Sequence, residues 1–211
     1  MPYSLIYNGL TSVEPNKSYL IIVYNDNENN LKVSILDDSQ ENMPIQSLEN
    51  CSFLQILQAV SGTDGIQISI PGQIPLGTLY YSNSFAAVIP NAPTQVSAVI
   101  NSTSLDIPIN PNPQKHYSII FSGNKDAPDY ILIEDDIPTP DATTYKYRFV
   151  NASNDFSSVS VALDATLNQT IAILNYKTIS PFSSDYQQKL KTFYFFDTES
   201  GKLITKLSMF F

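Results

Sequence analysis

Apolar and polar residues alternate with a period of two along much of this chain. Ile66, Ile68 and Ile70 alternate with Gln67 and Ser69, and the same alternation recurs at 31–35, 145–149 and 158–163. Successive side chains of a strand point to opposite faces, so this is the pattern of a strand with one buried face. The sequence therefore predicts an all-β fold built from half-buried antiparallel strands.

Four further segments are apolar at nearly every position, as central or interface strands are. They are 18–24, 116–121, 129–133 and 192–196. Turn residues such as Asn, Asp, Gly and Pro separate the strand patterns at short intervals. That rhythm is typical of immunoglobulin-like β-sandwiches, so we expect two such sandwiches in tandem.

One segment departs from the strand pattern. Residues 47–60 begin at Ser47, a good N-cap, and place Leu54, Leu57 and Val60 at helical spacing before Ser61 and Gly62. These features predict one short helix inserted in the first domain. A buried strand is the alternative interpretation of the same residues.

An internal similarity suggests how the chain is divided. Tyr19 and Asn25 recur 126 residues later as Tyr145 and Asn151. We interpret the two segments as the same strand–turn–strand in two related domains, 1–138 and 139–211, with Asn25 superposing on Asn151. The second domain is short, so we expect residues 140–211 to fold poorly alone.

Composition excludes some classes of protein. Hydrophobic residues make up 43% of the chain, enough for packed cores. The net charge is −9 and the 11 basic residues are scattered, so we expect no nucleic-acid partner. No apolar run approaches the ~20 residues of a membrane helix, so the chain is predicted not to span a membrane. The N-terminus lacks the pattern of a signal peptide.

The segment from Arg148 to Ser153 reads R-F-V-N-A-S, and a V-x-V strand begins at Val159. This pattern resembles a bacterial family of tandem-repeat domains of unknown function. In layout the chain is also similar to the accessory proteins of alginate O-acetylation, which are periplasmic two-domain β-proteins. The resemblance implies an exported protein of the periplasm, the medium or the cell surface, without catalytic residues.

Two residues of this motif, and the residue that corresponds to one of them in the first domain, have structural interpretations. Asn25 and Asn151 each follow a strand, where an Asn side chain commonly bonds to local backbone. Arg148 alternates with Tyr147 and Phe149, so we expect it to pair with an acidic neighbour or to lie along a tyrosine ring. A ligand or interface role for Arg148 is the alternative.

Four aromatic residues are candidates for contact with a ligand or partner. Tyr80 and Tyr81 are adjacent, so alternation along a strand would expose at least one of them. Phe210 and Phe211 end the chain. Only one of them can face its own core, so the other is expected to meet the first domain or a partner chain, unless the terminus is frayed.

Catalytic and metal chemistry have little support in the sequence. His116 is the only histidine and Cys51 the only cysteine, and neither lies in a nucleophile motif. Acidic residues recur at 37–38, 126–129 and 134–136, but none of these loops matches a calcium-loop pattern. We expect no enzyme, metal or cofactor, although carboxylates paired only by the fold are a route to glycosidase chemistry that sequence does not mark.

Two functions are favoured over an enzyme. The first is a non-catalytic exported accessory or scaffold protein, acting through protein–protein contacts in exopolysaccharide modification or at the cell surface. The alternative is a carbohydrate-binding module that uses exposed tyrosines. The partner is accordingly a protein or a polysaccharide.

Overall fold

The computed structural model describes residues 8–12, 18–25, 31–37, 51–71, 77–113, 115–135, 144–186 and 190–210. These residues form an all-β fold with several antiparallel sheet pairings, and they contain no helix. The first eight strands are β1 (Asn8–Ser12), β2 (Ser18–Asn25), β3 (Leu31–Asp37), β4 (Cys51–Gln58), β5 (Ile66–Ser69), β6 (Thr78–Leu79), β7 (Ser84–Pro90) and β8 (Thr94–Ile100). The remaining strands are β9 (Thr103–Ile109), β10 (His116–Asn124), β11 (Ala127–Asp135), β12 (Thr144–Asn151), β13 (Ser158–Ala162), β14 (Thr170–Asn175), β15 (Ser183–Tyr186), β16 (Leu190–Asp197) and β17 (Leu203–Phe210).

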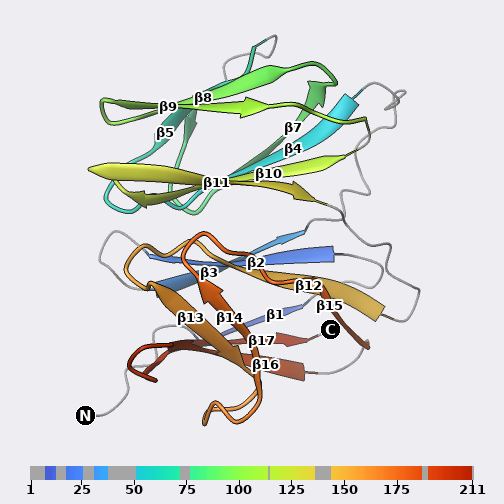
Figure 1. Cartoon of the computed structure of the whole chain (residues 1–211), viewed down its shortest axis with the longest axis vertical. Helices are drawn as coiled ribbons and strands as arrows, with labels where there is room; N and C mark the ends of the chain where they lie inside the picture. Colours follow the sequence, from blue (N-terminus) through green and yellow to red (C-terminus); the bar gives the residue numbers. More distant parts are fainter. Residues whose placement is uncertain are drawn as a thin grey trace. The chain divides into compact units, whose positions relative to one another are not determined.

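The strands divide into two compact units. Unit 1 contains β1–β3 and β12–β17, and unit 2 contains β4–β11. Each unit consists of two sheets that face each other in the manner of a sandwich (Figure 1). Unit 1 is therefore built from both ends of the chain, and unit 2 from its middle.

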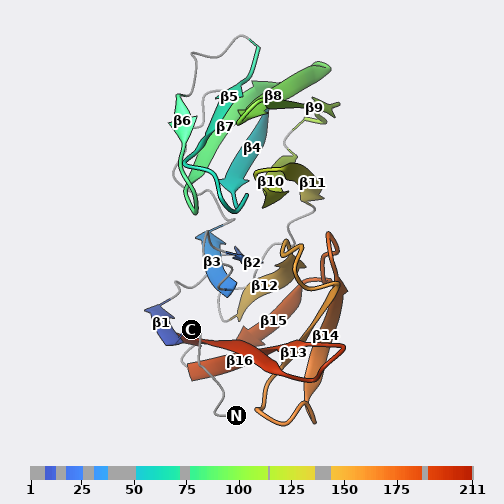
Figure 2. The same ribbon diagram turned by 90° about the vertical axis from the view of Figure 1, so that its left-hand side faces the viewer.

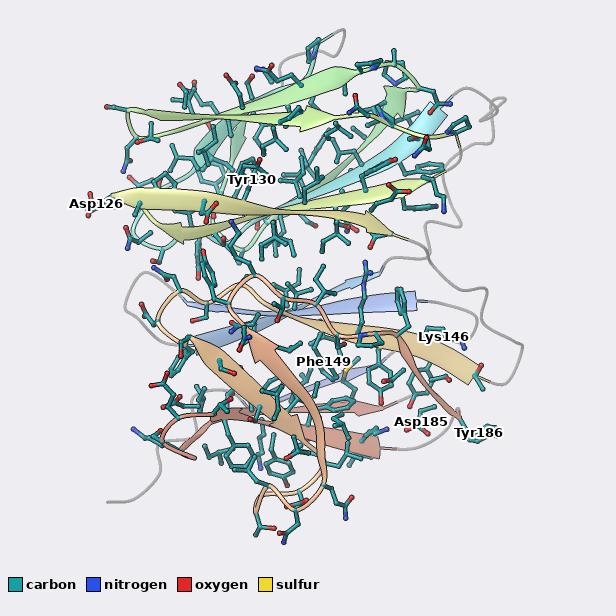
Figure 3. All side chains as sticks on the ribbon, in the orientation of Figure 1. Asp126, Tyr130, Lys146, Phe149, Asp185 and Tyr186 are labelled. Atoms are coloured by element: carbon teal, nitrogen blue, oxygen red, sulfur yellow. The ribbon has the colours of Figure 1, made fainter. Side chains whose placement is uncertain are left out.

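In unit 1 the sheet orders are β1-β17-β16-β13-β14 and β15-β12-β2-β3. Aromatic rings fill the space between these sheets. Phe149 lies in this interior in Figure 3, and its ring centroid is 5.1 Å from that of Phe193 and 6.0 Å from that of Phe195. Burial of such large rings is the main apolar contribution to this core.

In unit 2 the sheet orders are β11-β10-β4-β7 and β6-β5-β8-β9. Its core is mainly aliphatic, because every second residue of β5 and β8 points inward and these residues are Ile, Val and Ala. Ile66 and Ile68 are buried, whereas Gln67 and Ser69 between them are exposed, so the predicted alternation at 66–70 is confirmed. Figure 2 shows β6 at the edge of the second sheet, beside β5.

The predicted helix at 47–60 is wrong for the residues that the structure describes. Residues 51–58 form β4, which pairs with β10 on one side and β7 on the other. Leu54 and Ile56 point into the core at strand spacing, and Leu57 is buried as well. A strand buried on both faces has apolar residues at almost every position, so it also contains apolar residues at helical spacing. Ser47 lies outside the described residues.

The tandem arrangement also needs correction. The first three strands do not belong with residues 51–135, as a domain over 1–138 requires, but with residues 144–210. The two segments interpreted as a repeat lie side by side, because β2 pairs with β12 in parallel within one sheet. Both strands are central, so their similar sequences reflect similar surroundings within one sheet rather than two superposable domains.

The last strand, β17, has a pairing partner on each side in unit 1. β17 pairs with β16 in an antiparallel manner and with β1 in a parallel manner, and Met209 is fully buried. The backbone of Phe210 continues the strand, where it pairs with Leu190 and Ser12. Phe211 and the side chain of Phe210 lie outside the described residues. So do residues 136–143 of the segment 134–144, which contains two prolines and is predicted from the sequence to link the two domains.

Candidate functional site

Unit 2 carries a depression of about 320 Å³ on the outer face of the sheet β6-β5-β8-β9. It combines one exposed aromatic ring with several short polar side chains. Its lining residues are Thr63, Asp64, Gly65, Gln67, Thr78, Tyr80, Val99 and Asn101. The volume lies at the small end of the roughly 300–1,000 Å³ range of ligand pockets, so the site suits a small ligand or one segment of a larger ligand.

The floor of this depression consists of side chains that point to the outer face of the sheet. Gln67 is opposite Thr78 on one side and opposite Val99 on the other, so these three side chains form a row across β6, β5 and β8. Their neighbours Ile66, Ile68 and Ala98 point to the opposite face and are buried in the core. The rigid core of unit 2 therefore fixes the positions of the floor residues.

Gly65 forms one wall of the depression and lies close to Thr78 and Leu79. A Cβ atom on Gly65 would overlap with Cγ2 of Thr78 and would lie 3.2 Å from the carbonyl oxygen of Leu79. The Thr63 hydroxyl donates to the Gly65 carbonyl at 3.0 Å and holds this segment in place. Only a residue without a side chain fits here, which is a common role of glycine beside a binding surface.

A turn residue forms the opposite wall. Asn101 follows β8 in the left-handed region, with φ of 53°, a conformation that Asn tolerates better than most residues. Its Nδ2 donates to the Lys125 carbonyl at 3.2 Å. The amide plane is thus oriented before any ligand arrives.

Tyr80 is the aromatic element of the site. Its side chain is 59% exposed, whereas Tyr81 is half-buried. The expected exposure of at least one of the two is confirmed, but the reason differs, because β6 ends at Leu79 and both tyrosines lie in the connection that follows. The Tyr80 carbonyl accepts from the Asn83 amide at 3.1 Å, and the Ser82 amide donates to Gln58 at 2.9 Å, so the connection is anchored to β4.

Arg148, the other polar candidate, belongs to unit 1 and does not line this depression. Its side chain is buried, and its guanidinium lies 4.5 Å from the centroid of the Phe182 ring. The ring contact was expected with a tyrosine and is made with a phenylalanine. A buried cation over a ring favours a structural role for Arg148.

The asparagine of the R-F-V-N-A-S segment is structural, as predicted. The Asn151 side chain is buried, and its Nδ2 donates to the carbonyls of Phe156 at 3.2 Å and Leu174 at 3.1 Å. Its Oδ1 accepts from the Ser153 amide at 3.0 Å. One side chain therefore holds the turn after β12 against β14. The side chain of Asn25 lies outside the described residues.

His116 does not form a nucleophile–base pair with the nearest serine of its strand. The Ser118 hydroxyl donates to Oδ2 of Asp135 at 2.7 Å, so its proton points to the carboxylate and not to the imidazole. The imidazole instead stacks on Phe53, with ring centroids 4.8 Å apart, and burial lowers its pKa. Triad chemistry needs the serine proton to face the base.

The described part of unit 1 contains a partly buried network of titratable side chains. The Lys191 ammonium donates to Asp185 and, at 3.0 Å, to the Tyr147 hydroxyl. Asp185 and Tyr186 lie at the end of β15 in Figure 3, while Lys191 belongs to β16 of the other sheet. Burial, followed by the charge of Asp185, raises the pKa of Tyr145. The network joins the two sheets with its charges compensated, which is a structural arrangement.

Among the described residues, no group of three or more His, Cys, Asp or Glu side chains could hold a metal ion. Asp164 is a loop carboxylate whose hydrogen bonds are made within its own loop. It accepts from the amides of Thr166, Asn168 and Gln169, and it also accepts from the Thr166 hydroxyl. The hydrogen bond from that hydroxyl is the main reason that the pKa of Asp164 is lowered.

Sequence reasoning found Tyr80 but missed the polar residues around it. Asp64 and Gln67 come from one segment and Asn101 from another, and the pairing of β5 with β8 brings them together. The sequence did contain one signal for these residues. The alternation at 66–70 predicts that Gln67 and Ser69 face solvent, and Gln67 lines the depression.

The chain was compared with protein-family models and with curated proteins. No protein-family model matches it, and no curated protein matches it. The described part of the chain contains no helix of the length and apolarity needed to cross a membrane.

Proposed function

We propose that unit 2 is a carbohydrate-binding module and that the depression beside Tyr80 is its site. The observation that carries this proposal is the exposed Tyr80 ring next to Asp64, Gln67 and Asn101. A sugar ring has an apolar C–H face and a rim of hydroxyl groups. An aromatic ring offers an apolar surface to that face, and carboxylate and amide groups offer acceptors and donors to the rim.

Binding without cleavage fits the chemistry of the lining. Glycoside hydrolysis by the usual route needs two carboxyl groups on either side of the bond. Asp64 is the one carboxylate among the described residues that line the depression. We therefore propose a binding role and not a hydrolytic one.

Two exposed tyrosines make a matched test. Tyr80 is 59% exposed in unit 2, and Tyr186 is 66% exposed in unit 1. We expect Tyr80→Ala to lower the affinity of the full chain for a glycan at least about tenfold, and Tyr186→Ala to leave that affinity unchanged. Screening against a glycan array, followed by calorimetry, measures this. Equal affinities of the two variants would show that the Tyr80 site is not used.

A second candidate function is the exported accessory or scaffold protein suggested by the sequence resemblance. Its support is the outer edge of unit 1, where β14 pairs with β13 alone among the described strands. Ile171 and Ile173 on this strand are 41% and 62% exposed. Edge strands with exposed apolar residues are suited to pairing with another chain. An Ile173→Lys variant that still binds its partner in a pull-down would argue against this edge.

Two further proposals concern the type of sandwich and the cellular location of the protein. We propose that both units are immunoglobulin-like sandwiches, since each has two facing sheets over one core. We propose an exported or cell-surface location on the basis of the resemblance described above. Detection of the chain in a periplasmic or culture fraction tests that location.

A further inference from the structure

The depression beside Tyr80 continues into a second one along the same sheet. This second depression has a volume of about 250 Å³ and is lined by Gln67, Ile68, Ser69, Gly77, Thr78 and Val99. Gln67, Thr78 and Val99 line both depressions. The two depressions therefore adjoin each other at these three residues. We call the pair, which runs along β5 from Asp64 toward Ser69, the trough.

The two ends of this trough differ in chemistry. The Tyr80 end has an aromatic ring, a carboxylate and an amide, Asn101. The described residues at the Ser69 end include no aromatic ring, and they offer the Ser69 hydroxyl beside Gly77. A ligand would make its strongest contact at the Tyr80 end and a weaker contact at the Ser69 end.

The charge of the trough also restricts its ligand. Among the described residues that line the two depressions, Asp64 is the only formally charged side chain, and none is cationic. On the same face, the Asp106 carboxylate accepts from Ser97, which lies opposite Ser69 in the β5–β8 pairing. Lys125 lies next to the site, with its stem over Gly62, but it is not a lining residue. Like charges repel, and the chain as a whole carries −9.

We infer that the trough binds an oligosaccharide of uncharged sugars, with one ring against Tyr80 and at least one further ring toward Ser69. This inference rests on the proposed carbohydrate-binding function and adds the length and charge of the ligand. A polyuronate such as alginate is a poor ligand on this reasoning, because its carboxylates would lie beside Asp64 with no lining cation to compensate them.

The test uses the full chain and neutral linear oligosaccharides of one to four residues from the glucose, galactose, mannose and N-acetylglucosamine series. Oligouronates of the same lengths serve as the charged comparison. We expect affinity to rise about tenfold from one ring to two in the series that binds, and the oligouronates to bind at least about tenfold more weakly.

A substitution at the far end of the trough isolates the second ring. Ser69→Leu fills the Ser69 end with a side chain that neither stacks nor carries charge. We expect this variant to lose the gain from the second ring while keeping the affinity for the monosaccharide. Gln95→Leu is the matched control, because Gln95 is exposed on the same face but lines neither depression.

The outcomes separate the two proposals. A monosaccharide that binds as tightly as its oligomers, or a Ser69→Leu variant that behaves like Gln95→Leu, overturns the extended trough but leaves the Tyr80 site standing. Tighter binding of oligouronates than of neutral sugars overturns the inference about charge. Absence of binding to every member of the panel removes the carbohydrate function itself.

Discussion

Ile21 and Phe149 lie opposite each other in the parallel pairing of β2 with β12, and both are buried in the core of unit 1. Parallel neighbours need a long connection, and here that connection contains β3 and the whole of unit 2. Strands from the two ends of the chain thus share one core.

The first prediction concerns fragments. Residues 137–211 expressed alone lack β1–β3, which supply Ile21 and Val23 to the core and pair with β12 and β17. We expect this fragment to show no cooperative thermal transition by circular dichroism. Residues 1–41 joined to 137–211 by a short flexible linker should restore the transition. A sharp melt of the fragment alone would contradict the shared core.

The second prediction concerns the aromatic core. Phe149→Ala removes a buried ring that contacts Phe193 and Phe195, and such substitutions typically cost about 3–5 kcal/mol of unfolding free energy. Ile173→Ala, at a side chain that is 62% exposed, should cost no more than about 0.5 kcal/mol. Urea denaturation measures both. Similar losses in the two variants would mean that the ring packing contributes little.

The third prediction concerns the turn after β12. Asn151→Ala leaves the carbonyls of Phe156 and Leu174 without this donor in a buried setting, at a cost of about 1–3 kcal/mol. Asn175→Ala is the control, because Asn175 is exposed and its bonds to Thr178 use only its backbone carbonyl. If both variants unfold at the same urea concentration, Asn151 does not hold the turn.

The fourth prediction concerns the wall of the candidate site. Gly65→Ala forces a methyl group against Cγ2 of Thr78, and overpacking of this kind costs about 1–3 kcal/mol. Thr78→Ser removes that methyl carbon and keeps the hydroxyl. The double variant should therefore recover much of the stability lost by Gly65→Ala, as measured by thermal melting. A double variant as unstable as Gly65→Ala would assign the effect to the Leu79 carbonyl, which lies 3.2 Å from the same position.

The fifth prediction concerns pH. The folded-state pKa of Asp164 is lowered, chiefly by the hydrogen bond from the Thr166 hydroxyl and also by backbone amides, so the unfolded chain binds the proton more tightly. The resulting stability is present above the unfolded pKa of Asp, about 4, and is lost as the pH falls through the lowered folded value. Asp164→Ala should melt below the unmodified protein at pH 7, and the difference should shrink at pH 2. A difference that does not change with pH would show that the charge of Asp164 is not involved.

The sequence alone determined the secondary structure class and the faces of many strands. Alternation at 66–70 reports which side chains are buried, because a strand has only two faces and here water contacts one of them. At 145–149 the alternation does not report burial, because Arg148 between Tyr147 and Phe149 is buried as well. The structural role of Asn151 followed in the same way, since its bonds reach backbone close in sequence as well as β14. These features are local, or depend on a single repeated pattern.

Tertiary structure decided the rest. Whether 51–58 is a helix or a strand depended on β7 and β10, which pair with it along both of its edges and satisfy its backbone as a strand. That β2 and β12 are neighbours in one sheet, and not equivalents in two domains, depended on hydrogen bonds between segments far apart in the chain. The trough beside Tyr80 arose for the same reason. Pairing of β6, β5 and β8 assembles its floor, and no single segment contains enough of it to be recognised from sequence.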